Sequence, residues 1–541
     1  MNGEGLGRSL GVVVGGSLSK GIDVKLDEGV SVEELAEGRY VTVQGERRRF
    51  FGLITDVGLG SLDPSLPLTS PDPFTAKVLS GTGTFGTARV VPYLTLSGDA
   101  TSMLEGPQPA KTIPAHFSCV REATPRDVEL VFGTEDKDRF AIGNPLDLEA
   151  KVCLDMPAMV KRSTGVFGKT GTGKTFLTRL LLIGILQKGA ARSLVFDMHN
   201  EYGWSGRSED HGRVKGLKQL FPSQVRVFTL DEAHARLQQV AVDYVVRIGY
   251  GEVEPEDIEL LSETLGLNER QMEAVHRLAG RFGDGWLARV LALAGREEAE
   301  GRAEQIGEHG ATLAAVWRRL AALGRLSFLT PQEGAGDSVK KVLGYIDSGM
   351  SVVLEFGRYE NELAYLLVAN ILTRRLHELY RERVARAMAG EGAEPQPLVI
   401  AIEEAHKFLS PRLATQTIFG TIAREMRKFN VTLLVIDQRP SGIDEEVMSQ
   451  VGTKLICHLD NDRDIDSVLA GVSGKGELRT VLARLHPKRQ ALILGHAVPM
   501  PVVVQVREYG SPASYRELGY LEPAEKKALV ERDINEFWPK E

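Results

Sequence analysis

The sequence predicts an α/β protein with a helical insertion, preceded by a small β-barrel. Three observations predict this fold. Short β-branched runs separated by turn residues fill residues 1 to about 130, apolar strands alternate with helices from Ala141 onward, and a complete phosphate-loop motif occupies residues 168–175. The first pattern is typical of small barrels, and the second is typical of a parallel sheet covered on both faces.

The N-terminal region contains five short runs of strand-forming residues. They occupy residues 11–16, 21–26, 39–44, 48–57 and 89–96. The same region contains Gly81, Gly83 and Gly86 in the G-x-G-x-x-G spacing of a dinucleotide fingerprint. That fingerprint requires a helix directly after it, whereas residues 87–92 read as extended. We therefore interpret these glycines as part of a hairpin and predict no dinucleotide site there.

The phosphate-loop motif reads Gly-Lys-Thr-Gly-Thr-Gly-Lys-Thr, between a short strand at 163–167 and an apolar helix at 176–188. Glycines let successive backbone N–H groups face phosphate oxygens. Lys174 then meets the β- and γ-phosphates, and the Thr175 hydroxyl ligates Mg²⁺. The predicted cofactors are therefore ATP and Mg²⁺. The predicted nucleotide-binding residues are Gly168, Thr170, Gly171, Thr172, Gly173, Lys174, Thr175 and Phe176.

Composition places the chain among ordinary globular proteins that act in the cytoplasm. It has 541 residues, of which 43% are hydrophobic and 26% are charged. The longest apolar runs, such as residues 180–186, are too short to cross a membrane, and we see no secretory signal. The three scattered cysteines fit a reducing compartment. A net charge of −8 argues against a surface coated for nucleic acid, although a local basic stripe would still serve.

This length requires more than one domain. We expect a barrel over residues 1–135, a RecA-like P-loop ATPase core over 136–510, and a helical tail over 511–541. Charged, helical sequence at about 235–345 reads as an insertion in the core. The tail from residue 522 reads as an amphipathic helix that either braces a neighbouring subunit or packs on its own core.

An ATPase also needs carboxylates for Mg²⁺ and for the attacking water. Two pairs compete, Asp231-Glu232 and Glu403-Glu404. The uninterrupted apolar run 398–402 before the second pair is typical of a central parallel strand. Asp231 is already explained as the N-cap of a helix at 232–240. We therefore expect Glu403 to ligate Mg²⁺ and Glu404 to act as the catalytic base.

Three further residues are candidates for the same reaction. The apolar strand at 431–436 carries Gln438 to the sheet edge where ligands bind, either to orient water or to cap the turn before Pro440. Arg424 and Arg427 lie three residues apart on a predicted helix at 414–428, so they share one face. They are either arginines supplied to a neighbouring γ-phosphate or a solvated basic face.

Several motifs together resemble the HerA family of the FtsK–HerA superfamily. They are the phosphate loop, Asp197-Met-His-Asn-Glu-Tyr, Ile402-Glu-Glu-Ala-His, Ile422-Ala-Arg-Glu-Met-Arg-Lys-Phe and Ile436-Asp-Gln-Arg-Pro. The sequence Gly-Val-Val-Val-Gly-Gly-Ser-Leu near the N-terminus resembles that family's HAS barrel. The resemblance covers almost the whole chain and is least specific at 235–345.

The resemblance implies an ATP-driven DNA translocase or helicase that forms a homohexamer on duplex DNA. ATP would lie between subunits, with Arg427 as the arginine acting in trans and Arg424 as the second choice. The family's usual partner is a NurA-type nuclease in DNA end processing and repair. The alternative is a hexameric scaffold that activates an antiphage effector, such as a sirtuin-like protein or a nuclease, with little translocation. An ABC-type ATPase is disfavoured because Leu-Ser-Gly-Thr-Gly at 79–83 precedes the phosphate loop.

One position departs from the family pattern. The family usually has Asp before the catalytic Glu, and this chain has Glu403. The extra methylene puts the catalytic rate in question, although not ATP binding. The DNA-contacting residues are poorly marked: Arg207, Lys215, Lys407 and Arg412 follow the relevant strands, and each also reads as ordinary surface charge.

Overall fold

The computed structural model describes the chain in two compact units. It covers residues 7–62, 72–97, 106–208, 212–293, 295–306, 309–331, 337–359, 361–414, 417–425, 428–472, 474–522, 524–527 and 530–532. Unit 1 comprises residues 1–177 and 435–507, and unit 2 comprises residues 178–434 and 508–541. Strand β20 (Val431–Asp437) and helix α5 (Lys174–Lys188) each contain residues of both units.

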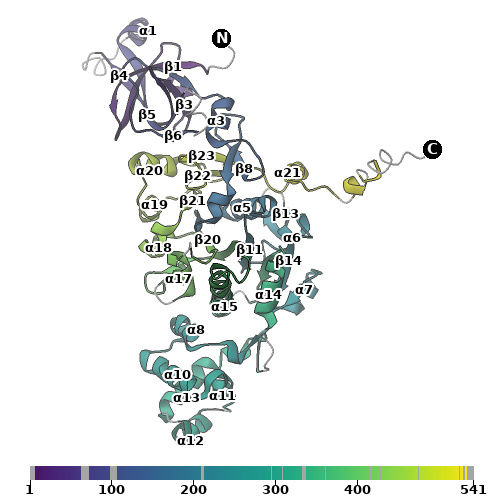
Figure 1. The fold of residues 1–541 in the computed structure, drawn as a ribbon. Helices are drawn as coiled ribbons and strands as arrows, with labels where there is room; N and C mark the ends of the chain where they lie inside the picture. The colour runs from purple at the N-terminus through teal and green to yellow at the C-terminus, as the bar shows by residue number, and fades with distance from the viewer. Residues whose placement is uncertain are drawn as a thin grey trace, which may run out of the picture. The chain divides into compact units, whose positions relative to one another are not determined.

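The N-terminal part of unit 1 is a closed antiparallel barrel, as predicted (Figure 1). Its strands run in the order β2-β1-β7-β3-β4-β5, and β2 also pairs with β5 to close the sheet. Their bounds are β1 Ser9–Ser17, β2 Gly21–Leu26, β3 Tyr40–Gln44, β4 Arg48–Ser61, β5 Thr84–Ser97 and β7 Cys119–Glu122, with β6 Gln108–Pro109 beside β5. Alternate residues such as Val41, Val43 and Val120 fill the core, because side chains of a strand point to opposite faces.

The barrel contains one helix that we did not predict. Helix α1 (Pro73–Thr82) lies between β4 and β5, and the Asp72 side chain caps it by accepting hydrogen bonds from the N–H groups of Phe74 and Thr75. The glycine fingerprint therefore covers the end of a helix and the start of strand β5, so the hairpin prediction is wrong in detail. The segment after it is a strand, as the rejection of the fingerprint requires.

The rest of unit 1 is a mixed sheet that carries the phosphate loop. The strand order is β10-β21-β22-β23-β8-β9, with β10 parallel to β21 and the other pairs antiparallel. The strands are β8 Arg139–Asn144, β9 Val152–Asp155, β10 Thr164–Phe167, β21 Thr453–Ile456, β22 Gln490–Gly495 and β23 Val502–Val506. Tyr40 joins barrel and sheet, because its buried hydroxyl accepts a hydrogen bond from Val503 N at 3.2 Å. The helices are α3 Pro125–Phe132, α4 Met156–Val160, α18 Glu445–Gln450, α19 Asp462–Val468 and α20 Lys475–Arg484.

Unit 2 contains a parallel sheet in the order β15-β14-β18-β11-β19. The strands are β11 Arg192–Asp197, β14 Val225–Thr229, β15 Tyr244–Val245, β18 Ser351–Glu355 and β19 Leu398–Glu403. Strands β18 and β19 are buried along their whole length. Such continuous burial explains why β19 is an uninterrupted apolar run up to its final glutamate, and why β18 is apolar between Ser351 and Glu355.

Helices cover this sheet and form the predicted insertion. Helix α15 (Glu362–Met388) is buried over Ala364–Thr373 and packs against α17 (Ile418–Glu425). The insertion is a cluster of short helices (Figure 1) comprising α8 Pro255–Leu260, α9 Ser262–Leu265, α10 Glu269–Phe282, α11 Trp286–Leu291, α12 Arg296–Ile306 and α13 Gly310–Leu320. The remaining elements of unit 2 are α6 Leu217–Leu220, α7 Glu232–Leu237, α14 Asp337–Asp347, α16 His406–Leu409, the hairpin β12 Ser205–Ser208 and β13 Gly212–Lys215, and the pair β16 Ile248–Gly249 and β17 Leu329–Thr330.

The insertion is fixed to α15 by a buried ion pair. Asp257 of α8 is fully buried and meets the Arg374 guanidinium at 2.9 Å, and Asn370 donates a second hydrogen bond to the same carboxylate at 2.7 Å. A buried charge is tolerated only when it is paired in this way.

The C-terminal segment returns to unit 2. Helix α21 (Pro512–Glu517) packs there, and the Tyr515 hydroxyl accepts a hydrogen bond from Lys215 N at 2.9 Å. Residues 524–527 and 530–532 are helical, residue 522 is not, and the other residues of the predicted tail helix lie outside the described residues. Within the described part of the chain, every helix is too short or too polar to span a membrane.

Candidate functional site

The phosphate loop of unit 1 has the backbone that its glycines permit. Gly171 and Gly173 have φ values of 78° and 94°, a region that side-chain-bearing residues rarely adopt. Gly168 is needed for a different reason, since a Cβ there would lie 2.7 Å from the Cys457 Cβ atom. Helix α5 begins at Lys174, which places the positive end of the helix directly after the loop.

The side chains of this loop bond to one another and to neighbouring strand ends. Lys174 Nζ donates to the Lys169 carbonyl at 2.7 Å, and the Thr172 hydroxyl donates to the same oxygen at 2.7 Å. Lys169 forms an ion pair with Asp460, and the Thr170 hydroxyl donates to the Gln438 side chain. The structure therefore brings the predicted residue Gln438 to the phosphate loop, where its amide oxygen accepts a hydrogen bond.

Three carboxyl groups lie at neighbouring strand ends in unit 2. Glu355 ends β18, Asp197 ends β11 and Glu403 ends β19, and these strands are adjacent in the sheet. Asp197 is fully buried, and the two glutamates are each 9% exposed. We call these three residues the carboxyl row. Because the strands are parallel, their C-terminal ends meet at one edge of the sheet, where ligands of open α/β sheets bind.

The members of the carboxyl row differ in their hydrogen bonds. Asp197 accepts three backbone N–H bonds, from Glu201 at 2.8 Å, Tyr202 at 2.7 Å and Gly203 at 3.2 Å. Burial nevertheless raises the pKa of Asp197 to about 6. For each flanking glutamate, burial and then the nearby Asp197 charge raise the pKa to about 8. The flanking carboxyls therefore keep their protons at neutral pH, while Asp197 is mostly ionised.

Glu403, the predicted Mg²⁺ ligand, is buried at the end of β19. Its Oε1 accepts a hydrogen bond from the buried Tyr202 hydroxyl at 2.8 Å. Its Oε2 is buried and has no hydrogen-bond partner in the described part of the chain. A buried carboxyl oxygen without a hydrogen-bond partner is suited to bind a cation. The Glu403 side chain is one methylene longer than that of Asp, but its carboxyl group still lies at the strand end. A cation would have to displace the proton that this carboxyl holds.

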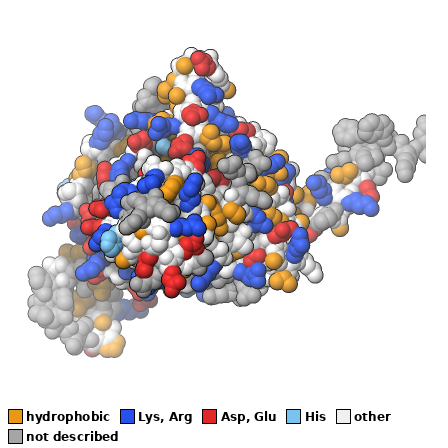
Figure 2. Space-filling model, turned by 90° about the horizontal axis from the view of Figure 1, so that it is seen from below, with side chains coloured by type: hydrophobic (Ala, Val, Ile, Leu, Met, Phe, Trp, Pro, Cys, Tyr) orange, Lys and Arg blue, Asp and Glu red, His pale blue; other side chains and the backbone are white. Residues whose placement is uncertain are grey.

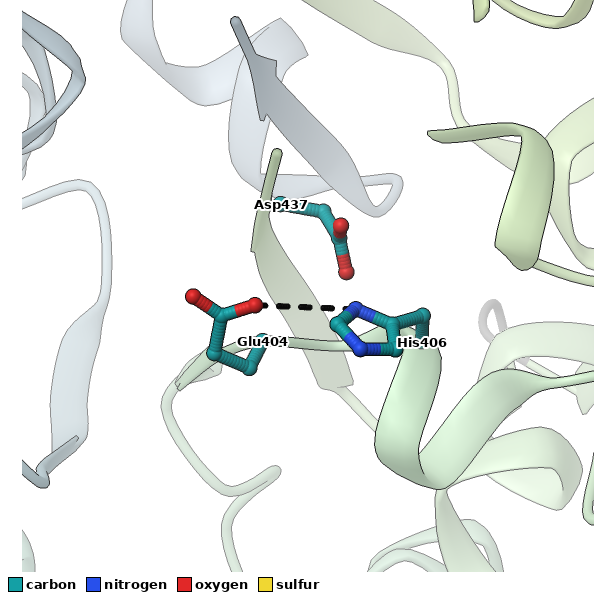
Figure 3. A group of neighbouring side chains, drawn as sticks. All are labelled: Glu404, His406 and Asp437. Carbon is teal, nitrogen blue, oxygen red and sulfur yellow. Dashed lines mark ion pairs between the residues drawn. The ribbon is translucent and has the colours of Figure 1, made fainter. Parts of the chain in front are cut away.

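Glu404 follows in an unusual conformation. Its φ is +48°, in the left-handed region that costs a non-glycine residue about 1–3 kcal/mol. The side chain is 22% exposed, and its carboxylate faces His406 at 3.6 Å (Figure 3). Asp437, also drawn in Figure 3, accepts a hydrogen bond from Arg439 N at 2.6 Å. Glu404 is thus turned out of the strand direction directly after the buried Glu403, and its role as the catalytic base stays a prediction.

The competing pair at residues 231–232 has a structural role. Asp231 caps α7 by accepting from His234 N at 3.0 Å, and it forms an ion pair with Arg358 at 2.7 Å. The predicted capping role of Asp231 is therefore confirmed. Helix α7 is shorter than the predicted helix and ends at Leu237.

Of the two predicted arginines, only Arg424 lies within the described residues. Arg424 lies on α17, and its guanidinium donates to the Ala414 carbonyl at 2.9 Å within its own chain. Arg427 lies outside the described residues. The choice between them as an arginine acting in trans therefore stays a prediction.

Three of the four basic residues considered for DNA contact have acidic partners in their own unit. Lys215 pairs with Glu522 at 3.3 Å, Lys407 with Glu362 at 3.8 Å, and Arg412 with Glu263. On the face drawn in Figure 2, the coloured Lys and Arg side chains are interspersed with Asp and Glu. Neither observation marks a DNA-binding surface.

A cavity of about 520 Å³ lies near the ends of β11, β14 and β18 in unit 2. It is lined mainly by polar side chains, including His199, Glu201, Trp204, Arg213, His234 and Glu355. None of the predicted nucleotide-binding residues lines it. The phosphate loop is therefore identified as a nucleotide-binding site by its motif and its backbone geometry, and not by this cavity.

Sequence reasoning missed Glu355, Tyr202 and Tyr365 and did not assign Asp197 to the site. Asp197 and Glu355 each end an apolar run, which is the same signal that identified Glu403. Tyr365 lies in the first turn of α15, and nothing in the local sequence indicates that its hydroxyl contacts a strand end.

The carboxyl row predicts how stability depends on pH. Glu355 has a pKa of about 8 in the folded chain and an ordinary value near 4.5 when unfolded. The folded state therefore binds more protons between these values, so this residue reduces stability as pH rises through that window. We expect Glu355→Gln, which mimics the protonated acid, to lose less stability than the wild type between pH 5.5 and pH 8.5. Urea midpoints at the two pH values measure this, and an equal loss in both proteins would contradict the assignment.

Comparison with known proteins finds similarity to the HerA helicases. Residues 140–376 match the family model described as "Helicase HerA, central domain". The DNA double-strand break repair helicase HerA of Pyrococcus furiosus is 26% identical over 404 residues, 71% of each chain. That of Sulfurisphaera tokodaii is 23% identical over 503 residues, 92% of this chain and 93% of the relative. Among solved structures, VirB4 of Thermoanaerobacter pseudethanolicus is 14% identical and has a TM-score of 0.46, covering 70% of this chain and 99% of that one.

The matched region begins in β8 and ends in α15, so it includes the phosphate loop and two members of the carboxyl row, Asp197 and Glu355. The similarity to the two archaeal relatives extends beyond it over most of the chain. The chain is therefore similar over most of its length to the HerA helicases, and it matches their central-domain model over residues 140–376.

Proposed function

We propose that this chain is an ATP-driven DNA translocase or helicase of the HerA type, which acts as a homohexameric ring on duplex DNA in the cytoplasm. The relatives' shared description as DNA double-strand break repair helicases supports the substrate and the process. In this proposal the ring powers a partner nuclease of the NurA type, or another effector. The domains are the barrel at 1–135, the ATPase core at 136–510 and the tail at 511–541.

The observation that carries the proposal is that one chain contains both a complete phosphate loop and a glutamate, Glu404, turned out at the end of a buried parallel strand. In this mechanism Lys174 and the loop N–H groups hold the phosphates. Glu404 accepts a proton from the attacking water. Gln438, which bonds to Thr170, orients that water. An arginine, Arg427 or else Arg424, stabilises transition-state charge from a neighbouring subunit.

Mg²⁺ fits the same proposal. The Thr175 hydroxyl and the Glu403 carboxylate would hold it, and the ion would neutralise charge on the transferred phosphate. Glu403 must lose its proton to do so, which its raised pKa makes harder at neutral pH than it would be for an exposed carboxylate.

Removal of the loop lysine tests the nucleotide site. Lys174→Ala deletes a charged donor to the phosphates, a loss of about 1.5–3 kcal/mol or more, so we expect ATP affinity to fall at least about tenfold. Equilibrium binding of a fluorescent ATP analogue measures the change. Lys188→Ala, at the other end of α5, is the matched control and should bind normally. Undiminished binding by Lys174→Ala would refute the assignment of the loop.

Steady-state ATP hydrolysis with and without linear duplex DNA tests the motor function, with Lys174→Ala as the blank. Because a translocase couples hydrolysis to movement along its track, we expect several-fold stimulation by DNA. Hydrolysis that is indifferent to DNA would contradict the translocase proposal and favour the ring that serves as a scaffold for an effector.

A further inference from the structure

Two buried tyrosines hold Glu403 from different directions. Tyr202 follows β11, and its hydroxyl donates a hydrogen bond to the Glu403 carboxyl at 2.8 Å. Tyr365 lies on α15 and bonds to the Glu403 backbone. Both tyrosine side chains are fully buried. The side chain and the main chain of one residue are thus held by separate elements of unit 2.

The Tyr365 hydroxyl bonds to both backbone polar groups of Glu403. It donates to Glu403 O at 2.9 Å and accepts from Glu403 N at 2.9 Å. The parallel register of β19 with β11 ends one residue earlier, where Phe196 pairs with Ile402. Tyr365 therefore supplies, from a helix, a donor and an acceptor beyond the end of that ladder. Buried backbone groups need such partners, since leaving one unpaired costs about 1–3 kcal/mol.

Tyr365 is itself firmly positioned. Its ring packs edge-on against Phe356 at 5.2 Å and Phe408 at 5.3 Å between ring centroids. Burial raises the pKa of its hydroxyl well above the ordinary value, so the group stays protonated and able to donate. Phe408 belongs to α16, which follows Glu404 in the chain. Tyr365 thus contacts the chain on both sides of Glu404.

The residue between these contacts is the one with the strained backbone. A φ of +48° at Glu404 persists only where the surroundings overdetermine it. We propose that Tyr365 is a positioning residue for ATP hydrolysis, whose hydroxyl clamps the Glu403 backbone and thereby fixes the direction of the Glu404 carboxylate. This inference rests on the proposed function of Glu404 as the catalytic base.

Tyr365→Phe tests the clamp, because it keeps the ring and removes only the hydroxyl. We expect kcat for ATP to fall about tenfold or more, since small displacements of a catalytic group are costly. The affinity for a non-hydrolysable ATP analogue should stay within about twofold, because the phosphate loop is untouched.

Tyr380→Phe is the matched control. Tyr380 is equally buried on the same helix, about 22 Å further along α15 by helix rise. The kcat of the Tyr380→Phe variant for ATP hydrolysis should stay within about twofold of the wild-type value. An equal loss in both variants, or a wild-type kcat in Tyr365→Phe, would overturn the proposal.

Hydrogen exchange at the Glu403 amide provides a readout that does not depend on activity. Tyr365→Phe removes the acceptor of that N–H, so the amide should exchange faster, whereas Tyr380→Phe should leave its rate unchanged. If the wild type does not hydrolyse ATP, the proposed function fails, while faster exchange in Tyr365→Phe would still support the clamp. Unchanged exchange would refute the clamp whatever the activity.

Discussion

The burial of carboxyl groups at adjacent strand ends is the constraint on which this site depends. Charged groups of one sign cannot share a low-dielectric edge of a sheet without a large electrostatic cost. The chain resolves the problem by giving Asp197 three backbone donors and leaving protons on its two neighbours. Glu403 therefore holds a proton at neutral pH, so it cannot accept another, and a cation must displace this proton to bind. In the proposed mechanism the catalytic base is Glu404, which lies past the buried strand and is partly exposed.

The phosphate loop faces the opposite requirement, since it must present donors. In the described structure its own carbonyl at Lys169 accepts bonds from Lys174 and Thr172, and Gln438 accepts from Thr170. Phosphate oxygens are stronger acceptors than a carbonyl or an amide, because charge-assisted bonds are about twice as strong. Nucleotide binding would thus replace hydrogen bonds within the loop by stronger hydrogen bonds to phosphate oxygens. If the Thr170 hydroxyl turned to a phosphate oxygen, Gln438 would lose the hydrogen bond that it accepts from Thr170.

Much of the fold could be predicted from local patterns. Uninterrupted apolar runs identified β19 and β20, and the barrel strands followed from short β-branched runs between turns. Helix α1 was missed because its residues 73–82 are exposed or only partly buried where described and show no apolar stripe. The barrel and the P-loop α/β core were both predicted correctly, whereas the proposed domain boundaries stay predictions.

The site was predictable only where a residue follows a recognisable strand or motif. Lys174, Glu403 and Glu404 meet that condition. The contacts of Tyr365 do not, because they join residues 38 positions apart through tertiary packing. The pKa of Glu403 is raised in part by the Asp197 charge. Asp197 lies near Glu403 only because strands β11 and β19 are neighbours in the sheet. Residue propensities and motif spacing predict neither the Tyr365 contacts nor the proximity of Asp197 to Glu403.

The central claim is that Glu404, and not Asp231, activates water for ATP hydrolysis. Single-turnover hydrolysis by Glu404→Gln and Asp231→Asn, each saturated with ATP, tests it most directly. Asn still caps a helix, so the second variant keeps the fold of α7. The account predicts a loss of about 10²–10⁴-fold in Glu404→Gln with ATP still bound, and near-normal turnover in Asp231→Asn. Normal turnover by Glu404→Gln, with loss in Asp231→Asn, would contradict it.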